Sequence, residues 1–177
     1  MSHVAELHKH GAPSSLGIFI VTCSTSKFKE LQSGQQPTDT SGDIIEKLTS
    51  TAGHRVEGRQ LISDSKSMIR RAAKKALASK RVDVLIITGG TGISPRDVTI
   101  EGISIFVEKV IPGFGELFRR ISYDKIGSSA MLSRALAASV NGKLIFCLPG
   151  SPDGVQTAME QLILPEVGHM IKISRQA

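Results

Sequence analysis

The part of this sequence best suited to holding a ligand is a cluster of glycines and threonines. Three glycines and two threonines lie in Thr88–Gly92, directly after an apolar run. Glycine lets the backbone come close to a ligand and adopt positive φ angles, so successive N–H groups can point at a phosphate or a carboxylate. A turn between a strand and a helix needs fewer glycines than this. We therefore expect an anion-binding loop, formed by Gly89, Gly90, Thr91 and Gly92.

Two familiar phosphate-binding patterns do not fit this loop. A Walker loop ends in Gly-Lys followed by Ser or Thr, and the dinucleotide fingerprint has the spacing G-x-G-x-x-G. Neither pattern occurs at residues 88–92. The loop therefore indicates an anion site of a different kind.

A carboxylate follows the loop after a short turn. Pro95 makes this turn rigid and sets Arg96 and Asp97 beside the glycines. A carboxylate next to a phosphate is repulsive unless a cation bridges the two, so we expect Asp97 to hold Mg²⁺ together with phosphate oxygens. The alternative is that Asp97 only pairs with Arg96 or closes a turn. Thr99 is expected to cap the helix that follows.

The segments that must position the loop alternate between strands and helices. Apolar and often β-branched runs predict strands at residues 16–22, 56–62, 82–88, 135–140 and 143–148. Helical spacing of apolar residues predicts helices at 44–53, 66–81, 99–110, 116–121 and 153–173, with an interruption at Pro165. This order predicts a three-layer α/β/α fold with a mostly parallel sheet. The glycine loop then lies at the carboxyl end of a strand, where such sheets bind ligands.

Local signals refine this outline. Asn141-Gly142 predicts a tight hairpin, so the last two strands should be antiparallel. Pro112-Gly113-Phe114-Gly115 predicts a turn between two helices, and Gly53 predicts the end of the first helix. Asp64 is placed to cap the basic helix at 66–81. The polar stretch at 24–40 shows no clear pattern.

Length and composition predict one domain with a separate arm. A chain of 177 residues with 40% hydrophobic content can bury one substantial core, which we place at residues 16–177. Residues 1–15 precede any periodic segment and predict a flexible N-terminal arm. Its three histidines fit no zinc pattern; they are His3, His8 and His10. No apolar run approaches the roughly 20 residues that span a bilayer, and no secretory signal is evident, so we expect a cytoplasmic protein.

Charge and cysteine content point to no further chemistry. Lysine and arginine exceed aspartate and glutamate by 22 to 16, a net charge of +6. Much of this surplus lies at residues 66–81, where apolar residues at helical spacing predict one solvated face of an amphipathic helix. With no Trp, one Tyr and no nucleic-acid-binding motif, nucleic acid is not expected as a partner. Cys23 and Cys147 end apolar runs and are expected to be buried and reduced.

Five ordered motifs resemble one known family. The first is Thr88–Gly92 with the following Ser94–Thr99 and Glu101. The others are Asp39-Thr40-Ser41-Gly42, Pro112-Gly113-Phe114-Gly115-Glu116, Leu132-Ser133-Arg134 and Leu148-Pro149-Gly150-Ser151-Pro152. Together they resemble the molybdenum-cofactor biosynthesis proteins of the MogA and MoaB group, with the MoaB branch favoured. The resemblance runs from about Leu16 to the C-terminus and implies a molybdopterin-binding-like fold.

The resemblance also implies an activity and a site. The terminal phosphate of molybdopterin would attack the α-phosphate of ATP, giving adenylyl-molybdopterin and pyrophosphate with Mg²⁺ as cofactor. The glycine loop would bind the nucleotide with Pro149, Gly150 and Ser151. Asp97 and Asp64 would be catalytic, and the pterin would be bound by Ser133, Arg134, Thr99 and Ser94. The alternative is a noncatalytic pterin-binding or scaffold protein of the same pathway, which hands a cofactor precursor to a partner.

The resemblance also implies an oligomer, and the sequence differs from the family pattern at residues 24–27. The family implies a homotrimer or a hexamer made of two trimers, with possible contacts to other cofactor-biosynthesis proteins. Ser24-Thr25-Ser26-Lys27 stands where the family often shows Ser-Asp-Arg. An acid is lost there, and lysine replaces an arginine with different hydrogen-bond geometry. Pterin contacts at this position should therefore differ.

Overall fold

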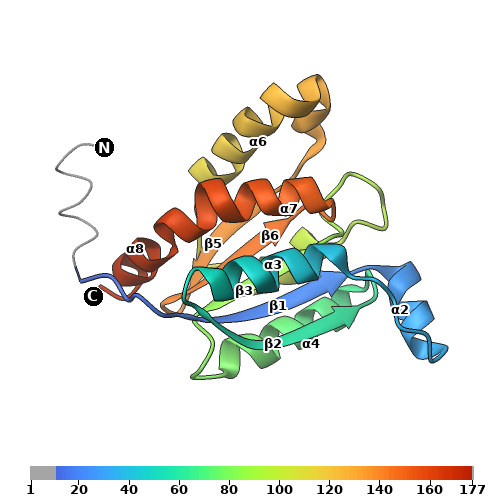
Figure 1. The fold of residues 1–177 in the computed structure, drawn as a ribbon, viewed down its shortest axis with the longest axis horizontal. Coiled ribbons are helices and arrows are strands. Elements are labelled where there is room, and N and C mark those ends of the chain that lie inside the picture. The colour runs from blue at the N-terminus through green and yellow to red at the C-terminus, as the bar shows by residue number, and fades with distance from the viewer. Residues whose placement is uncertain (1–10, 177) are drawn as a thin grey trace.

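A computed structural model describes residues 11–176, and six strands form its one sheet (Figure 1). The strands are β1 (Gly17–Cys23), β2 (Arg55–Ile62), β3 (Val84–Thr88), β4 (Lys109–Val110), β5 (Leu136–Val140) and β6 (Lys143–Leu148). Their order across the sheet is β2-β1-β3-β6-β5-β4. The first four strands in this order are parallel, and β5 runs antiparallel to both β6 and β4. The predicted, mostly parallel sheet is confirmed.

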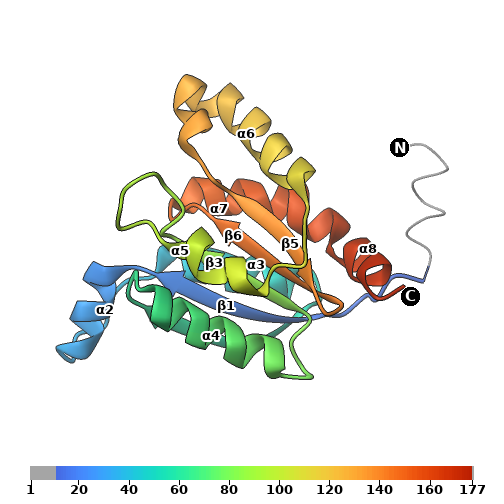
Figure 2. The same ribbon diagram turned by 180° about the vertical axis from the view of Figure 1, so that it is seen from behind.

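Helices cover both faces of the sheet (Figures 1 and 2). They are α2 (Thr25–Gln32), α3 (Thr40–Thr51), α4 (Lys66–Ala78), α5 (Thr99–Ile103), α6 (Pro112–Ile126), α7 (Pro152–Ala158) and α8 (Leu164–Ser174). Short 3-10 turns follow α5 and α6 at Ser104–Phe106 and Gly127–Leu132, and a π-helical segment, Met159–Ile163, joins α7 to α8. Figure 1 shows α6 extending away from the sheet.

Alternation along β1 divides the core into two layers. Ile18 and Ile20 pack with residues of α3, α6, α7 and α8 on one face. Phe19 and Val21 pack with residues of α4 and α5 on the other face. Because successive strand residues point to opposite faces, a nearly continuous apolar strand needs cover on both sides. The three-layer prediction is therefore confirmed.

The strand register brings the ends of β1, β3 and β6 together. Thr22 pairs with Thr88, and Thr88 pairs with Leu148, all at the carboxyl ends of parallel strands. The predicted hairpin is also confirmed, since Asn141 and Gly142 have φ angles of 47° and 70°, the left-handed pair that a two-residue turn requires.

Two predictions around Pro112 are wrong. The helix predicted at 99–110 ends as α5 at Ile103, and Lys109–Val110 instead forms β4, the sheet edge. The residue before a proline is driven towards extended backbone, which favours this strand. The predicted turn at residues 112–115 is the first turn of α6, because proline suits the start of a helix and Phe114 packs into the core.

Two more helix ends differ from expectation. The polar stretch at 24–40 contains α2, whose N-cap is Ser24. Asp64 does not cap α4, because the N-cap is Ser65 and makes no side-chain cap bond.

Two other predictions about helix ends are confirmed. The interruption predicted at Pro165 is present, since this residue lies in the first turn of α8, directly after the π-helical segment. Gly53 follows the end of α3 with a φ of 80°, as its predicted role requires.

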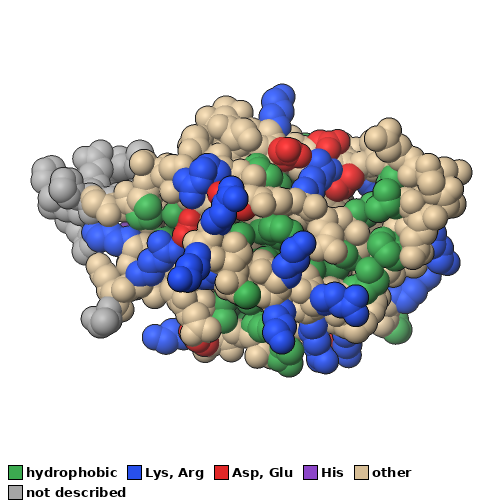
Figure 3. Space-filling view, turned by 90° about the horizontal axis from the view of Figure 1, so that it is seen from below, with side chains coloured by type: hydrophobic (Ala, Val, Ile, Leu, Met, Phe, Trp, Pro, Cys, Tyr) green, Lys and Arg blue, Asp and Glu red, His purple; other side chains and the backbone are tan. Residues whose placement is uncertain are grey.

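The basic segment is the solvated face of α4, as predicted. Ile69, Ala72, Ala73 and Ala76 are buried against the sheet. The exposed side of α4 and of the turn after it carries lysine and arginine, and Figure 3 shows such side chains spread over the lower face of the molecule. The exposed cations are Lys66, Arg70, Arg71, Lys74, Lys75, Lys80 and Arg81.

The structure also bears on the predictions for the cysteines, for membrane-spanning helices and for the N-terminal arm. Cys23 and Cys147 are buried and unpaired, and burial raises the pKa of both thiols, that of Cys23 to about 12. Within residues 11–176, no helix is both long and apolar enough to cross a bilayer. Most of the expected arm, with its histidines, lies outside the described residues. The described part, 11–15, contains no helix or strand, and a Cβ on Gly168 of α8 would lie 2.8 Å from the Pro13 carbonyl oxygen.

Candidate functional site

A cavity of about 460 Å³ lies at the carboxyl ends of β1, β3 and β6. Five segments that are distant in sequence form its walls: the end of β1 with the start of α2, the start of α3, the glycine loop with Asp97, the loop after α6, and the loop after β6. Its lining residues are Thr22, Cys23, Ser24, Lys27, Asp39, Ser41, Thr88, Gly89, Gly90, Thr91, Gly92, Asp97, Leu132, Ser133, Pro149 and Gly150. The predicted anion loop is thus part of a cavity.

The glycine loop has the backbone of an anion-binding turn. Gly89 and Gly90 have φ angles of 93° and 63°, which L-residues rarely adopt. A side chain at Gly89 would also overlap the carbonyl oxygen of Cys23. The amides of Gly90, Thr91 and Gly92 donate no hydrogen bond to any group of residues 11–176. Three free N–H groups beside a cavity can bind phosphate or carboxylate oxygens.

Buried threonines fix this loop from beneath. The Thr99 hydroxyl, which is fully buried, donates to the Gly89 carbonyl at 2.8 Å, and the Thr99 amide donates to the Gly90 carbonyl at 3.0 Å. The Thr88 hydroxyl donates to the Pro149 carbonyl at 2.8 Å. The prediction that Thr99 caps α5 is therefore wrong. Its side chain bonds to the glycine loop instead, and the N-cap of α5 is Val98. It is also not among the residues that line the cavity.

Asp97 lies beside the glycines, as predicted. Its Oδ2 accepts a hydrogen bond from the Ser94 amide at 2.9 Å and would lie 2.7 Å from a Cβ on Gly92. Among the described residues its Oδ1 has no hydrogen-bond partner, and no ion pair joins it to Arg96. Asp97 thus closes a turn with one oxygen, and its side chain lines the cavity.

Arg134 holds the same loop from outside. Its guanidinium donates to the carbonyls of Thr91 and Asp97 at 3.3 and 3.0 Å and pairs with the Glu101 carboxylate. The hydrogen bond from Arg134 lowers the pKa of the Glu101 carboxyl. Arg134 and Ser94 line a smaller hollow on the outer side of the loop rather than the cavity itself.

Asp64 lies against the loop but serves α2. Its Oδ2 accepts hydrogen bonds from the amide and the hydroxyl of Thr25, both at 2.8 Å, and so holds the first turn of that helix. A Cβ on Gly90 would lie 3.0 Å from Asp64 Oδ1. The first turn of α2 brings Lys27 to the cavity lining. A helix N-terminus and an ammonium group both favour an anionic ligand.

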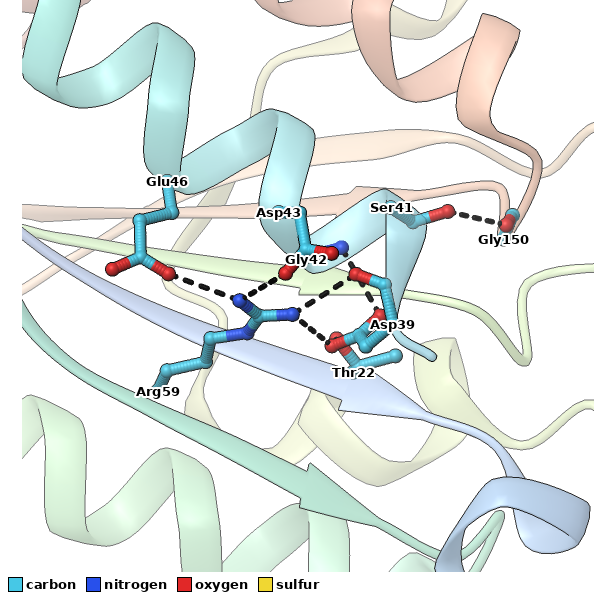
Figure 4. Close-up of polar contacts among 8 residues, drawn as sticks. All are labelled: Thr22, Asp39, Ser41, Gly42, Asp43, Glu46, Arg59 and Gly150. Atoms are coloured by element: carbon cyan, nitrogen blue, oxygen red, sulfur yellow. Dashed lines mark hydrogen bonds and ion pairs between the residues drawn. The ribbon is translucent and has the colours of Figure 1, made fainter. Parts of the chain in front are cut away.

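The start of α3 also lines the cavity, and Figure 4 shows its polar contacts. The Ser41 hydroxyl donates to the Gly150 carbonyl at 2.8 Å. Asp39 is the N-cap of α3; its carboxylate accepts from the Gly42 amide at 3.1 Å and from the Thr22 hydroxyl at 2.7 Å. Sequence reasoning used the Asp39-Thr40-Ser41-Gly42 motif only as a family marker and gave it no place in the site. Its Asp-x-x-Gly capping pattern before a helix was the available signal.

The remaining predicted residues divide between two hollows. Ser133, Pro149 and Gly150 line the main cavity. Ser133 and Pro149 also line a second hollow of about 430 Å³ between α6 and α7, and Ser151 lies only there. The two hollows are therefore adjacent, which gives room for a ligand with two parts.

A comparison with known families decides what this site belongs to. The family described as "Probable molybdopterin binding domain" matches residues 19–169. The chain belongs to this molybdopterin-binding family. The match spans every segment that lines the cavity, so the site described above lies wholly within the family's domain.

Individual members of the molybdopterin-binding family are similar over nearly the whole chain. Molybdenum cofactor biosynthesis protein B of Bacillus cereus is 45% identical over 164 residues, 92% of this chain and 93% of the relative. A protein of Methanocaldococcus jannaschii named "Probable molybdopterin adenylyltransferase" is 38% identical over 152 residues, 86% of this chain and 90% of the relative. The tungsten cofactor synthesizing protein MoaB of Pyrococcus furiosus has a crystal structure with a TM-score of 0.81 and 33% identity, covering 93% of this chain and all of that chain. These similarities confirm the resemblance found in the motifs.

Proposed function

We propose that this protein acts in molybdenum or tungsten cofactor biosynthesis as a molybdopterin adenylyltransferase. The terminal phosphate of molybdopterin attacks the α-phosphorus of ATP, adenylyl-molybdopterin forms, and pyrophosphate leaves. The observation that carries the proposal is one cavity lined by Lys27, Asp97 and the glycine loop, three of whose amides have no hydrogen-bond partner among the described residues. The adenylyltransferase name of the Methanocaldococcus jannaschii relative supports this choice.

The work left to the protein is positioning and electrostatics. A phosphate monoester is already ionised near neutral pH, because its second pKa is about 6, so no general base is needed to prepare it. The amides of Gly90, Thr91 and Gly92 donate hydrogen bonds to phosphate oxygens of the nucleotide, and Lys27 adds positive charge. Ser133 and Pro149, which line both hollows, lie between the nucleotide in one and the pterin in the other. Bringing the two phosphates together in the correct orientation lowers the barrier.

The residues present fit a Mg²⁺ ion that is held mainly by substrate. Residues 11–176 contain no group of three or more His, Cys, Asp or Glu that could form a complete metal site. Mg²⁺ needs only one or two carboxylates when phosphate oxygens and waters complete its shell. Asp97 offers one fixed carboxylate with a free oxygen at the glycine loop. A bound Mg²⁺ would offset negative charge on the triphosphate.

One experiment separates this activity from a noncatalytic role. The protein is incubated with molybdopterin, ATP and Mg²⁺, and the release of pyrophosphate and the formation of adenylyl-molybdopterin are measured. Both products are expected in equal amounts. Tight molybdopterin binding with no pyrophosphate would reject the enzyme and leave the scaffold alternative.

The assembly and location follow the same proposal. We propose a trimer, or a hexamer of two trimers; exposed apolar side chains on α6 and the turn after it support association with other subunits. Leu117, Tyr123, Ile126 and Met131 are each more than half exposed. Other proteins of the pathway would meet the assembly in the cytoplasm.

A further inference from the structure

Arg59 lies outside the cavity lining, yet it contacts the cavity's α3 wall in four places (Figure 4). It comes from β2, one of the two edge strands, and its side chain is about a quarter exposed. Its Nη2 donates to the carbonyl oxygen and to Oδ2 of Asp39, at 2.9 and 2.8 Å. Its Nη1 donates to Asp43 at 2.6 Å and to Glu46 at 2.9 Å. One guanidinium thus holds the N-cap and the first two turns of α3.

The Asp39 end of this contact is part of the cavity. Asp39 is 9% exposed and lines the cavity together with Thr22, whose hydroxyl donates to it. Burial alone would raise the pKa of the Asp39 carboxyl, but the hydrogen bonds from Arg59, then Thr22 and Gly42, outweigh burial and lower it. Asp39 therefore remains a charged, fully hydrogen-bonded group in the cavity wall.

The same turn is linked to the glycine loop. Ser41 donates its hydroxyl hydrogen bond to the Gly150 carbonyl, and a Cβ on Gly150 would lie only 3.3 Å from the Cα of Gly89. A displacement of the first turn of α3 would therefore be passed through Gly150 to the loop that carries the free amides. Because even a Cβ on Gly150 would crowd Gly89, the two backbone segments are closely packed and can move little independently.

Gly42 shows how closely the parts fit. A side chain there would overlap both the Asp39 carboxylate and the Arg59 guanidinium. The pair occupies the volume that a Cβ would need, so the carboxylate and the guanidinium pack directly against the backbone of the helix start.

We propose that Arg59 is a positioning residue for the substrate site, which fixes the first turn of α3 so that Asp39 and Ser41 face the glycine loop at the spacing that bound nucleotide requires. The inference rests on the proposed function for the identity of the substrate. Its structural part concerns the free protein and does not depend on turnover.

The test uses Arg59→Met, which keeps much of the side-chain length and removes the charge and all donors. We expect the KM for ATP to rise about tenfold with kcat changed by less than about threefold, as for a group that supports ground-state binding rather than the reaction itself. In the free protein, hydrogen–deuterium exchange should become faster at residues 39–43 and 149–151, while the β5–β6 hairpin keeps its wild-type exchange.

Two further variants make the test specific. Asp43→Asn with Glu46→Gln removes the negative charge from only the outer two partners, whose side chains are 62% and 49% exposed, and should leave the KM within about twofold of wild type because surface ion pairs contribute little. Arg59→Lys keeps the positive charge but lacks the planar set of guanidinium donors. Its ATP affinity should lie between those of Arg59→Met and the wild type. If Arg59→Met does not fold, Arg59→Lys decides: a raised KM with retained kcat supports the proposal, and a wild-type KM overturns it.

Other outcomes are equally clear. An unchanged KM and unchanged exchange in Arg59→Met would overturn the proposal, as would an equal rise in KM in the double variant. If the wild-type protein forms no adenylyl-molybdopterin, the proposed function fails, but exchange and equilibrium ATP binding still test Arg59. Faster exchange with weaker ATP binding would then support the positioning role without the catalytic one.

Discussion

Asp97 and Asp64 lie on two sides of the glycine loop, but the chain uses them differently. Asp64 accepts two hydrogen bonds from Thr25 through one oxygen, so a substitution there acts on two contacts that hold the first turn of α2. Asp97 accepts only the Ser94 amide, which an asparagine oxygen can also accept. A substitution at Asp97 therefore reports on the site with less structural disturbance.

The first prediction concerns Asp97→Asn. Turnover should fall by on the order of a hundredfold, about 3 kcal/mol of transition-state stabilisation, because the charge proposed to hold Mg²⁺ is lost. Molybdopterin binding and the melting temperature should change little. Steady-state kinetics at saturating ATP measure the effect, and Asp124→Asn, an exposed carboxylate of α6, is the matched control. Near wild-type turnover at low Mg²⁺ would rule out the role.

A second prediction addresses the backbone at Gly90. Alanine there must adopt a φ near 63° and would place its Cβ 2.6 Å from the Thr99 hydroxyl oxygen. We expect Gly90→Ala to lose about 1–2 kcal/mol of unfolding free energy from the left-handed backbone alone. ATP affinity should fall as the amides turn away. Urea unfolding and calorimetric titration measure the two effects. Gly113→Ala in α6, where a Cβ meets nothing within 4 Å, should not destabilise the fold.

Among the helices, strands and turns, the sequence predicted correctly those that are marked by their own residue types. Asn141-Gly142 and the glycines after β3 each carry a turn in their own residue types. The helix α2 was missed because none of its residues is buried, so no apolar periodicity marks it. The strand β4 was missed because it has two residues, both exposed, and exists only through its pairing with β5.

The connection between α3 and β2 yields a pH prediction. His54 Nδ1 accepts a hydrogen bond from the Leu16 amide at 3.3 Å, which requires the neutral ring. Burial, with help from the nearby Arg55 charge, lowers the pKa of His54 below its ordinary value of about 6.5. The unfolded chain then binds more protons than the folded chain as pH falls through this window. Stability should therefore decrease as the pH drops below about 7.

The variant His54→Asn tests this, since its amide oxygen can accept the same hydrogen bond without titrating. Its melting temperature should vary less between pH 7.5 and pH 5 than that of the wild type. Equal slopes for the two proteins would show that His54 does not contribute to the pH dependence.

At the scale of the whole molecule, what the sequence could not supply was contact between distant segments. The glycine loop and Asp97 are nine residues apart or fewer, so their proximity was predictable. Arg59 of β2 bonds to Asp39, which precedes it by 20 residues in the sequence. Arg134 bonds to Asp97, which precedes it by 37 residues. Such contacts depend on strand order and register, which no local pattern encodes.

Assembly is the prediction that belongs to this scale. Light scattering at micromolar concentration should give the mass of a trimer or a hexamer, because the exposed apolar residues of α6 need cover. Deleting residues 1–10 should leave the fold intact and weaken any association beyond the trimer. The deletion should stop there, since Pro13 packs against Gly168. A monomer would contradict the proposal, and loss of folded protein would show that the deleted residues are structural.

The cavity is lined by residues from Thr22 to Gly150, drawn from the ends of the parallel strands β1 and β3, two helix starts and the loops after β3, α6 and β6. Separation of any of these strands destroys the cavity, so a ligand that fills it binds the folded chain and not the unfolded one. By mass action, free ligand at a hundred times its Kd then adds about 2.7 kcal/mol to the unfolding free energy. A substrate of this enzyme family would thus also act as a stabiliser of the chain, and the amount of folded protein in a cell would rise with the supply of its own substrates.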